Sequence, residues 1–455
     1  MTAYAAVNTL RLDDMNPHIY RTHDGGKTWK EIVNGIPGGA PVSVVREDPK
    51  RKGLLFAGSE TQVYFSIDDG DHWQSLRLNM AASSVRDLVI KDDDLVIGTH
   101  GRGIWILDDI TPLRQITAAT ASETAVLFKP QTAMRVRWNM NTDTPLPPDE
   151  PGAPNPPEGA IINYFLNADA TGPVTLEILD GKTVLRKYSS EDSVFKPDVT
   201  TSTIPLYWYR DLKGLSAKSG MHRFTWDVHY QSLDGSTRLG GPNLAIAAIG
   251  HNTIQQPSTP WANPGTYTVR LTVNGTAYTQ PIVVKADPRV KTPALALQQV
   301  YTLSRAAYDE AIATRNAATQ ARALKDQIAK VLPQATGANT AALSAYATKL
   351  ETLAGAAAAG GRGGRGGGAG GGGGRGGAAN APVVETLSGA SAALGGVMNL
   401  LQGADVRPTT VQLNAIAAAR AQGTRVMARW TALITTELVA LNRTLTAAGL
   451  SAIKK

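Results

Sequence analysis

The chain has 455 residues, of which 18% are charged and none is cysteine, and its formal net charge is +7. At about 100–200 residues per domain, this length allows about two to four domains. The absence of cysteine excludes a disulfide scaffold, a thiolate metal site and a cysteine nucleophile. Since no apolar run reaches about 18 residues, we expect no membrane span.

The beginning of the chain, residues 1–7, is typical of a β-strand that is already under way. It contains neither a basic segment nor a long apolar run, so we expect no signal peptide in this chain. This beginning favours a truncated gene product or an internal start within a larger protein.

A pattern of the form Ser/Thr-x-Asp-x-Gly-x-x-Trp then occurs twice, 44 residues apart, each time between two short apolar strands. Its fixed positions are Thr22, Asp24, Gly26 and Trp29 in the first copy and Ser66, Asp68, Gly70 and Trp73 in the second. A third unit at 98–108 aligns with 58–68 but lacks the pattern. Four strands in about 40–45 residues are typical of one propeller blade. Residues 1–117 therefore predict the terminal blades of an incomplete β-propeller.

The chemistry of this pattern suits a turn better than a catalytic site. Aspartate and hydroxyl side chains accept hydrogen bonds from turn N–H groups, and glycine allows a positive φ. We expect Trp29 and Trp73 to bury their rings between a hairpin and its neighbour. The acidic runs at 68–71 and 92–94 lack the spacing of a calcium loop, so we expect neither a metal nor a cofactor. The pattern resembles the Asp-box of bacterial neuraminidase repeats.

The connections opposite these turns in each predicted blade carry charged side chains. That end of a propeller is its usual ligand side. We therefore interpret six residues as a candidate rim for an acidic or sugar-like ligand: Arg11, Asp13, Asp14, Glu60, His100 and Arg102. The alternative, in which they are solvated loop residues, stays open.

The next region, residues 118–290, predicts an immunoglobulin-like β-sandwich. About seven short strands with alternating apolar residues and turn signals between them are typical of this fold. We expect Trp226 and Tyr267 to lie in its core. The segment 139–159 contains seven prolines and is predicted to be an extended surface loop.

The last region, residues 291–455, predicts a helical bundle interrupted by a disordered glycine-rich linker at 355–380. Residues 355–377 include 15 glycines and three arginines, a composition that cannot bury a core. These arginines have no aromatic neighbours for base stacking, so we expect no nucleic-acid partner. We expect a long helix to follow from Pro408, which suits a first-turn position, with Thr409 or Arg407 near the cap.

The net charge is unevenly distributed, with −3 in residues 1–290 and +10 in residues 291–455. The high isoelectric point is thus a property of the helical region and does not indicate a uniformly basic nucleic-acid-binding protein. We expect this basic region to dock on an acidic surface, such as the preceding domains or an envelope polymer.

Several motifs together resemble one family. Beside the two Asp-boxes, they are the segments 97–109, 220–227, 264–267 and 287–289. The chain is similar to the C-terminal part of bacterial proteins named glycosyl hydrolases, which carry a sortilin-type Asp-box β-propeller. This resemblance implies a periplasmic or extracellular location and a multidomain fold that is mainly β and then α. It transfers no catalytic residue, because the positions of known sialidase and endoglucanase sites are not matched.

Three functions follow as hypotheses. The leading one is the ligand-binding and scaffold portion of an exported Asp-box propeller protein, without a complete active site in this chain. The alternatives are a sialidase-like or polysaccharide-degrading glycoside hydrolase that needs the missing blades, and a protein-interaction module. The expected partners are a carbohydrate or protein ligand and further blades, supplied by the same chain or another.

Overall fold

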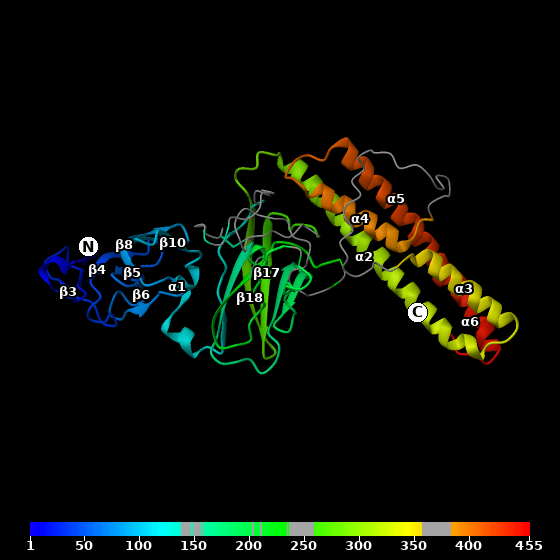
Figure 1. Ribbon diagram of the computed structural model, residues 1–455, viewed down its shortest axis with the longest axis horizontal. Helices are drawn as coiled ribbons and strands as arrows, with labels where there is room; N and C mark the ends of the chain where they lie inside the picture. Colours follow the sequence, from blue (N-terminus) through cyan, green and yellow to red (C-terminus); the bar gives the residue numbers. More distant parts are fainter. Residues whose placement is uncertain are drawn as a thin grey trace.

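The computed structural model describes residues 1–137, 147, 149, 156–157, 159–202, 204–209, 212–233, 235, 259–356 and 384–455. Figure 1 shows small antiparallel sheets at one end of the molecule, a larger two-sheet body in the middle and long helices at the other end. The chain is thus β-rich first and α-helical afterwards, as the sequence predicts. Most of the predicted proline-rich loop and residues 357–380 of the predicted linker lie outside the described residues.

Three small antiparallel sheets form the N-terminal part. The first sheet contains β1 (Ala3–Ala6), β2 (Ile19–Thr22) and β3 (Lys30–Glu31). The second contains β4 (Val42–Glu47), β5 (Leu55–Ser59), β6 (Val63–Ser66) and β7 (Gln74–Ser75). The third contains β8 (Ser84–Lys91), β9 (Asp94–His100) and β10 (Ile104–Leu107).

The pairing register relates the strands of these three sheets to one another. Ala3 lies opposite Thr22 in the first sheet, just as Leu55 lies opposite Ser66 in the second. β1 is therefore equivalent to β5. β9 is equivalent to β5 as well, because the β8–β9 pair has its bulge at the same place as the β4–β5 pair. Among the described strands, the first sheet thus has no equivalent of β4, and the third sheet has none of β7.

The second sheet is covered on both faces, whereas its neighbours are covered on one. All residues of β5 are buried. One core joins Ile19 and Ile32 of the first sheet to Trp73 of the second, and another joins Phe56 of the second to Val85 of the third. Successive strand residues point to opposite faces, and the outward face of the third sheet exposes large aliphatic side chains: Val89, Ile104 and Ile106.

A short helix contacts the second sheet, and a buried aspartate joins the third sheet to the body. Helix α1 (Thr111–Gln115) places Arg114 against Asp48 of the second sheet, with 2.8 Å between nitrogen and oxygen. The Asp109 carboxylate accepts a hydrogen bond of 2.6 Å from the Asn163 side chain, and the Asp109 carbonyl accepts one of 3.1 Å from Arg223. Asp109 is itself buried, so these bonds replace the water that its carboxylate loses.

The body consists of two sheets with a shared core. One contains β11 (Ala125–Leu127), β13 (Ala160–Leu166) and β16 (Gly220–Trp226). The other contains β12 (Ala133–Arg135), β18 (Thr276–Ala286), β17 (Gly265–Val273), β14 (Thr175–Asp180) and β15 (Thr183–Ser189), in this order. The described pairs are antiparallel except that β12 and β18 are parallel. Trp226 and Tyr267 lie in the core, where their rings meet edge to face.

Five helices form the C-terminal part that the structure describes: α2 (Ala294–Val331), α3 (Ala338–Ala354), α4 (Leu387–Leu401), α5 (Thr410–Ala432) and α6 (Leu438–Ala447). A π-helical turn, Leu433–Glu437, links the last two. The Thr409 hydroxyl caps α5 by accepting a hydrogen bond from the Gln412 N–H. Thr409, one of the two expected cap residues, is thus the cap, and Pro408 precedes it instead of lying in the first turn. None of the described helices combines the length and hydropathy that a membrane crossing requires.

The helices dock on the body through apolar side chains. Tyr308 of α2 and Met398 of α4 belong to the same core as Trp226. The ion pairs across this contact connect arginines of the body with Asp405 of the helical region. The helical region therefore contacts the preceding region, as predicted. At this junction, however, the body supplies the basic side chains and the helical region supplies the acidic one, which is the reverse of the predicted charges. Burial of apolar surface dominates the contact.

Candidate functional site

Both Asp-boxes form the same hydrogen-bonded turn. Asp24 Oδ1 accepts bonds of 2.9 Å from the backbone N–H groups of Lys27 and Thr28, and the Thr22 hydroxyl accepts one of 3.0 Å from Gly26. In the second copy, the equivalent bonds run from His72 to Asp68 and from Gly70 to Ser66, each at 2.9 Å. Gly26 and Gly70 both have a φ of +89°, which favours glycine. The bonds to Thr28 hold the pKa of Asp24 well below its usual range.

The two tryptophans of the boxes differ. Trp73 is 4% exposed, and its indole N–H donates a 2.8 Å hydrogen bond to the Ile32 carbonyl of the first sheet. Trp29 is 47% exposed. The prediction that Trp29 buries its ring is therefore wrong. The physical reason is that the first sheet covers Trp73, whereas no described sheet lies on the corresponding side of Trp29.

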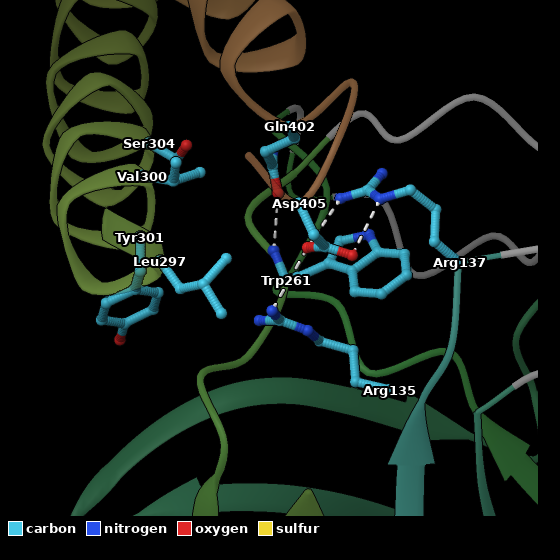
Figure 2. Close-up of a pocket in the computed structure, with 9 residues that line it drawn as sticks. All are labelled: Arg135, Arg137, Trp261, Leu297, Val300, Tyr301, Ser304, Gln402 and Asp405. Carbon is cyan, nitrogen blue, oxygen red and sulfur yellow. Dashed lines mark hydrogen bonds and ion pairs between the residues drawn. The ribbon is translucent and has the colours of Figure 1, made fainter. Parts of the chain in front are cut away.

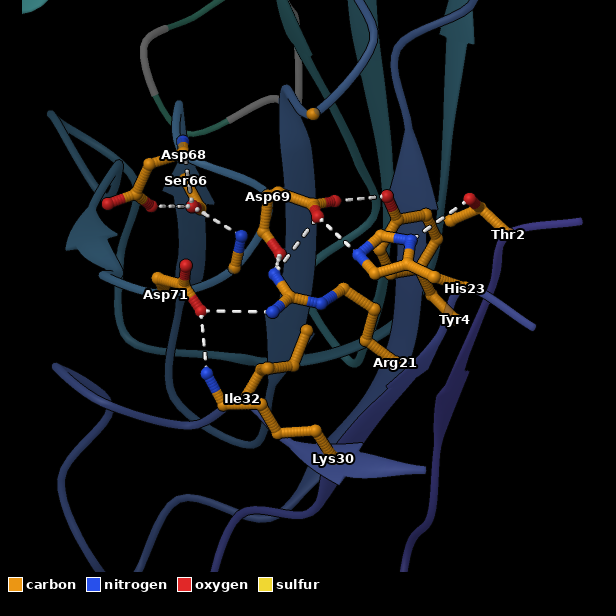
Figure 3. Close-up of polar contacts among 12 residues, drawn as sticks. Thr2, Tyr4, Arg21, His23, Lys30, Ile32, Ser66, Asp68, Asp69 and Asp71 are labelled. Carbon is orange, nitrogen blue, oxygen red and sulfur yellow. Dashed lines mark hydrogen bonds and ion pairs between the residues drawn. The ribbon is translucent and has the colours of Figure 1, made fainter. Parts of the chain in front are cut away.

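A polar cluster spans the first and second sheets beside the second box (Figure 3). Arg21 is 9% exposed and forms ion pairs with Asp69 at 3.0 Å and Asp71 at 3.1 Å. Lys30 reaches Asp71 at 3.1 Å, which lowers the pKa of Asp71. His23 approaches Asp69 at 3.0 Å. The carboxylates of the second sheet are thus held by basic side chains of the first.

Tyr4 completes this cluster. Its hydroxyl donates a hydrogen bond to Asp69 and lies 3.4 Å from Glu47. Burial and then the bond to Asp69 raise the pKa of the Tyr4 hydroxyl, so it stays protonated at neutral pH. A protonated tyrosine among paired carboxylates is suited to clamp two sheets rather than to transfer protons. Our sequence reasoning missed this cluster; its signal is that the second box has Asp69 and Asp71 where the first has Gly25 and Lys27.

The six rim residues lie in corresponding connections of the three sheets. Arg11, Asp13 and Asp14 lie between β1 and β2, and Glu60 lies between β5 and β6. His100 ends β9, and Arg102 lies in the turn before β10. Since antiparallel strands alternate in direction, each connection is at the strand end opposite the Asp-box side.

Two of these six side chains are engaged within the chain. The His18 ring bridges Asp14 at 2.7 Å and Glu31 at 2.8 Å; these hydrogen bonds, first that of Glu31, raise the pKa of His18. Glu60 forms an ion pair with Arg86 at 3.1 Å. The other four are Arg11, Asp13, His100 and Arg102. Their side chains form no hydrogen bond or ion pair with any described residue. No such contact joins any two of the six.

A second candidate site is a cavity between the body and the helices (Figure 2). Asp405 lies between Arg135 and Arg137, at 3.4 Å and 3.2 Å. Both guanidinium groups lie over the ring of Trp261, with 5.4 Å and 4.7 Å to its centre. Gln402 accepts a hydrogen bond of 2.8 Å from the Trp261 backbone.

This cavity is a small gap in the contact between the body and the helices. Its volume of about 20 Å³ has room for about one or two water molecules. Burial lowers the pKa of the Arg135 guanidinium, and Asp405 opposes that effect. We interpret the contacts of Arg135, Arg137 and Asp405 as holding the helices against the body. Our sequence reasoning missed it; the alternation of Arg135 and Arg137 beside a strand is the signal that could have found it.

No group of three or more His, Cys, Asp or Glu side chains in the described ranges could hold a metal ion. No protein-family model matches the sequence, and no curated protein matches it.

Solved structures give distant similarities. YCF48, determined with a bound D1 peptide, aligns with 34% of this chain and 41% of its own, at 16% identity and a TM-score of 0.16. The extracellular domain of the one-component system BT4673 from B. thetaiotaomicron aligns with 59% of this chain and 28% of its own, at 8% identity and a TM-score of 0.17. A hybrid two-component BT4673 extracellular domain gives 60% and 30%, at 9% identity and 0.18. The alignments span less than half of each of these chains, and such TM-scores transfer neither fold nor function.

Proposed function

We propose that this chain is the ligand-binding and scaffold portion of an exported Asp-box propeller protein, without a complete active site of its own. The proposal assigns residues 1–117 to propeller blades, 118–290 to an immunoglobulin-like sandwich and 291–455 to a helical bundle. The equivalent registers and two matching Asp-box turns support the blade assignment. The exported location rests on the sequence resemblance.

The observation that carries the ligand-binding role is the free charge at one end of the sheets. Arg11, Asp13, His100 and Arg102 are exposed in corresponding connections and make no side-chain bond within the described residues. Elsewhere in these sheets, carboxylates such as Asp69 and Asp93 are paired with basic side chains. Two free arginines favour an acidic ligand, because guanidinium groups bind carboxylates in two-point contacts.

Calorimetric titration of the purified chain with acidic and neutral oligosaccharides tests this function. We expect acidic oligosaccharides to bind and the double variant Arg11→Ala/Arg102→Ala to weaken binding about tenfold or more. Arg443→Ala is the matched control, since Arg443 is exposed on α6, far from these connections. It should leave binding unchanged.

Two results would contradict the proposal. If no oligosaccharide binds, or if the double variant binds as tightly as the unmodified chain, the rim is not a ligand site. If the purified chain hydrolyses aryl-glycosides or polysaccharides, it has an active site of its own, and the glycoside hydrolase hypothesis replaces the scaffold.

A further inference from the structure

We propose that the outward face of the first sheet, defined here by Gly26, Trp29 and the free edge of β1, docks a further antiparallel β-sheet of the same repeat. This inference rests on the sheet repeat in the proposed function and not on its ligand rim. The contact between the first and second sheets serves as its template. Each feature of that contact has an uncovered counterpart on this face.

The first feature is the tryptophan of the box. Trp73 of the second sheet receives the segment that follows β3 of the first sheet. Its indole N–H donates to the Ile32 carbonyl, and its backbone N–H donates to the Asn34 carbonyl, both at 2.8 Å. Trp29 occupies the same position of the first box, yet no described carbonyl accepts a bond from its indole.

The second feature is a pair of glycines that allow close approach. A Cβ atom on Gly35 would lie 2.2 Å from the Trp73 carbonyl oxygen, so only glycine fits there. A Cβ atom on Gly70 would lie 2.4 Å from the end of the Ile32 side chain, which therefore fills the notch above that glycine. Above the equivalent Gly26, nothing but the Trp29 indole comes within contact distance.

The third feature is a strand edge. β5 pairs with β4 on one side and β6 on the other, whereas the equivalent β1 pairs with β2 alone among the described strands. Its backbone groups on the free edge are thus available to another strand. If a strand equivalent to β4 follows the incoming sheet repeat, this strand would pair with the free edge of β1.

The template also defines the occupant. It must present two backbone carbonyls to Trp29, a branched aliphatic side chain above Gly26 and a glycine opposite the Trp29 carbonyl. The segment after β3, with Ile32, Asn34 and Gly35, has this chemistry. The third sheet of a second copy could not supply this segment, because the described third sheet has no equivalent of β7 or of the segment that follows β7.

A duplication within the full chain tests the proposal. Residues 1–54 are fused directly before Ala3, so that a second sheet repeat and a copy of β4 precede β1 in the natural register. The added copy carries Trp29→Phe, so that the fusion keeps the eight tryptophans of the chain. Loss of one 5-fluorotryptophan NMR resonance on Trp29→Phe in the original copy then identifies the original Trp29. We expect its resonance to lose its solvent isotope shift, as for a buried indole, and the thermal midpoint to rise.

The matched control is the same fusion with Gly35→Val in the added copy. That side chain blocks the close approach, so Trp29 should remain solvent-exposed. The proposal is overturned if Trp29 stays exposed in the first fusion, if it is buried equally in the control, or if the fusion fails to fold while the unmodified chain folds. Burial of Trp29 in the unmodified chain with rising concentration would make a second copy the occupant and would also overturn it.

The outcomes separate this inference from the proposed function. Binding of acidic oligosaccharides by the unmodified chain does not depend on Trp29. If the fusion leaves Trp29 exposed while the rim still binds, the docking inference fails alone. If Trp29 becomes buried while no oligosaccharide binds, the ligand-binding function fails alone.

Discussion

The two Asp-boxes have the same sequence pattern and the same turn, but opposite surroundings. In both, the aspartate accepts two or more bonds from the turn, and the glycine has the same φ. The second box lies against the first sheet and buries Trp73, whereas the first box leaves Trp29 about half exposed. The motif therefore determines the turn, and the neighbouring sheet determines whether the tryptophan joins a core.

Removing each tryptophan should produce the largest difference between the boxes. Trp73→Ala should lower the free energy of unfolding by about 3–5 kcal/mol, because it leaves a cavity between two sheets. Trp29→Ala should lower it by about 1 kcal/mol or less, as for an exposed side chain. Urea unfolding at equilibrium measures both values. Equal losses would show that the motif itself, and not the neighbour, sets the role of the ring.

A matched pair of glycines tests the same contrast on the other side of the second sheet. A Cβ atom on Gly58 would lie 2.4 Å from Val85 of the third sheet, whereas one on the equivalent Gly98 would meet only the Asp87 carbonyl, at 3.6 Å. Gly58→Val should therefore destabilise the chain by about 1–3 kcal/mol through overpacking. Gly98→Val should change stability by less than about 0.5 kcal/mol. Thermal unfolding measures the stability of both variants. A large loss of stability in Gly98→Val would contradict the conclusion that the outward face of the third sheet is uncovered.

Exchanging one residue between the boxes tests the clamp. Asp69→Gly gives the second box the residue of the first and removes the ion pair between Asp69 and Arg21, so stability should fall by about 1–2 kcal/mol. The reverse exchange, Gly25→Asp, should have an effect below about 0.5 kcal/mol, since aspartate tolerates a positive φ there. Urea unfolding compares them. If Asp69→Gly is neutral, the ion pairs do not hold the sheets together.

The smallest expected effect is the contribution of His18 to stability, which depends on pH. His18 joins Asp14 and Glu31 in the first sheet, whereas the equivalent contact of the second sheet joins the uncharged Gln62 and Ser75 at 2.7 Å. The raised pKa of His18 means that its contribution is full below the unfolded pKa, near about 6.5, and is lost as pH rises through the folded value.

The matched variant is His18→Gln, which copies the second sheet. Between about pH 5.5 and about pH 8.5, the unmodified chain should lose more stability than this variant, by under about 1 kcal/mol because the pair is partly exposed. Urea midpoints at both pH values measure the difference. The same pH slope in both proteins would show that His18 does not contribute.

Much of this architecture could be predicted from the sequence because it depends on local patterns. The Asp-box positions Asp24 and Asp68 hold turns, and the alternation around Tyr267 marks a strand of the body. The helical region also follows from local propensity, although the start at Thr409 rather than Pro408 depended on a cap competing with a proline.

The remainder depended on contacts between distant segments. Which of Trp29 and Trp73 is buried could not be decided from the shared motif, because the sheet that covers Trp73 is a separate element. The cluster of Arg21 with Asp69, and the junction of Arg135 with Asp405, join residues 48 and 270 positions apart. Such pairs become visible only when the sheets and helices are placed together. The six rim residues remain a prediction that the titrations must test.

The central claim is that a neighbouring sheet, and not the Asp-box itself, decides whether its tryptophan is buried. Fluorine NMR of the 5-fluorotryptophan-labelled chain tests this most directly. The variants Trp29→Phe and Trp73→Phe identify the resonances of these two residues among those of the eight tryptophans. We predict that the Trp29 resonance shifts between light and heavy water, as an exposed indole does, and that the Trp73 resonance does not. Equal solvent isotope shifts for the two resonances would contradict the account.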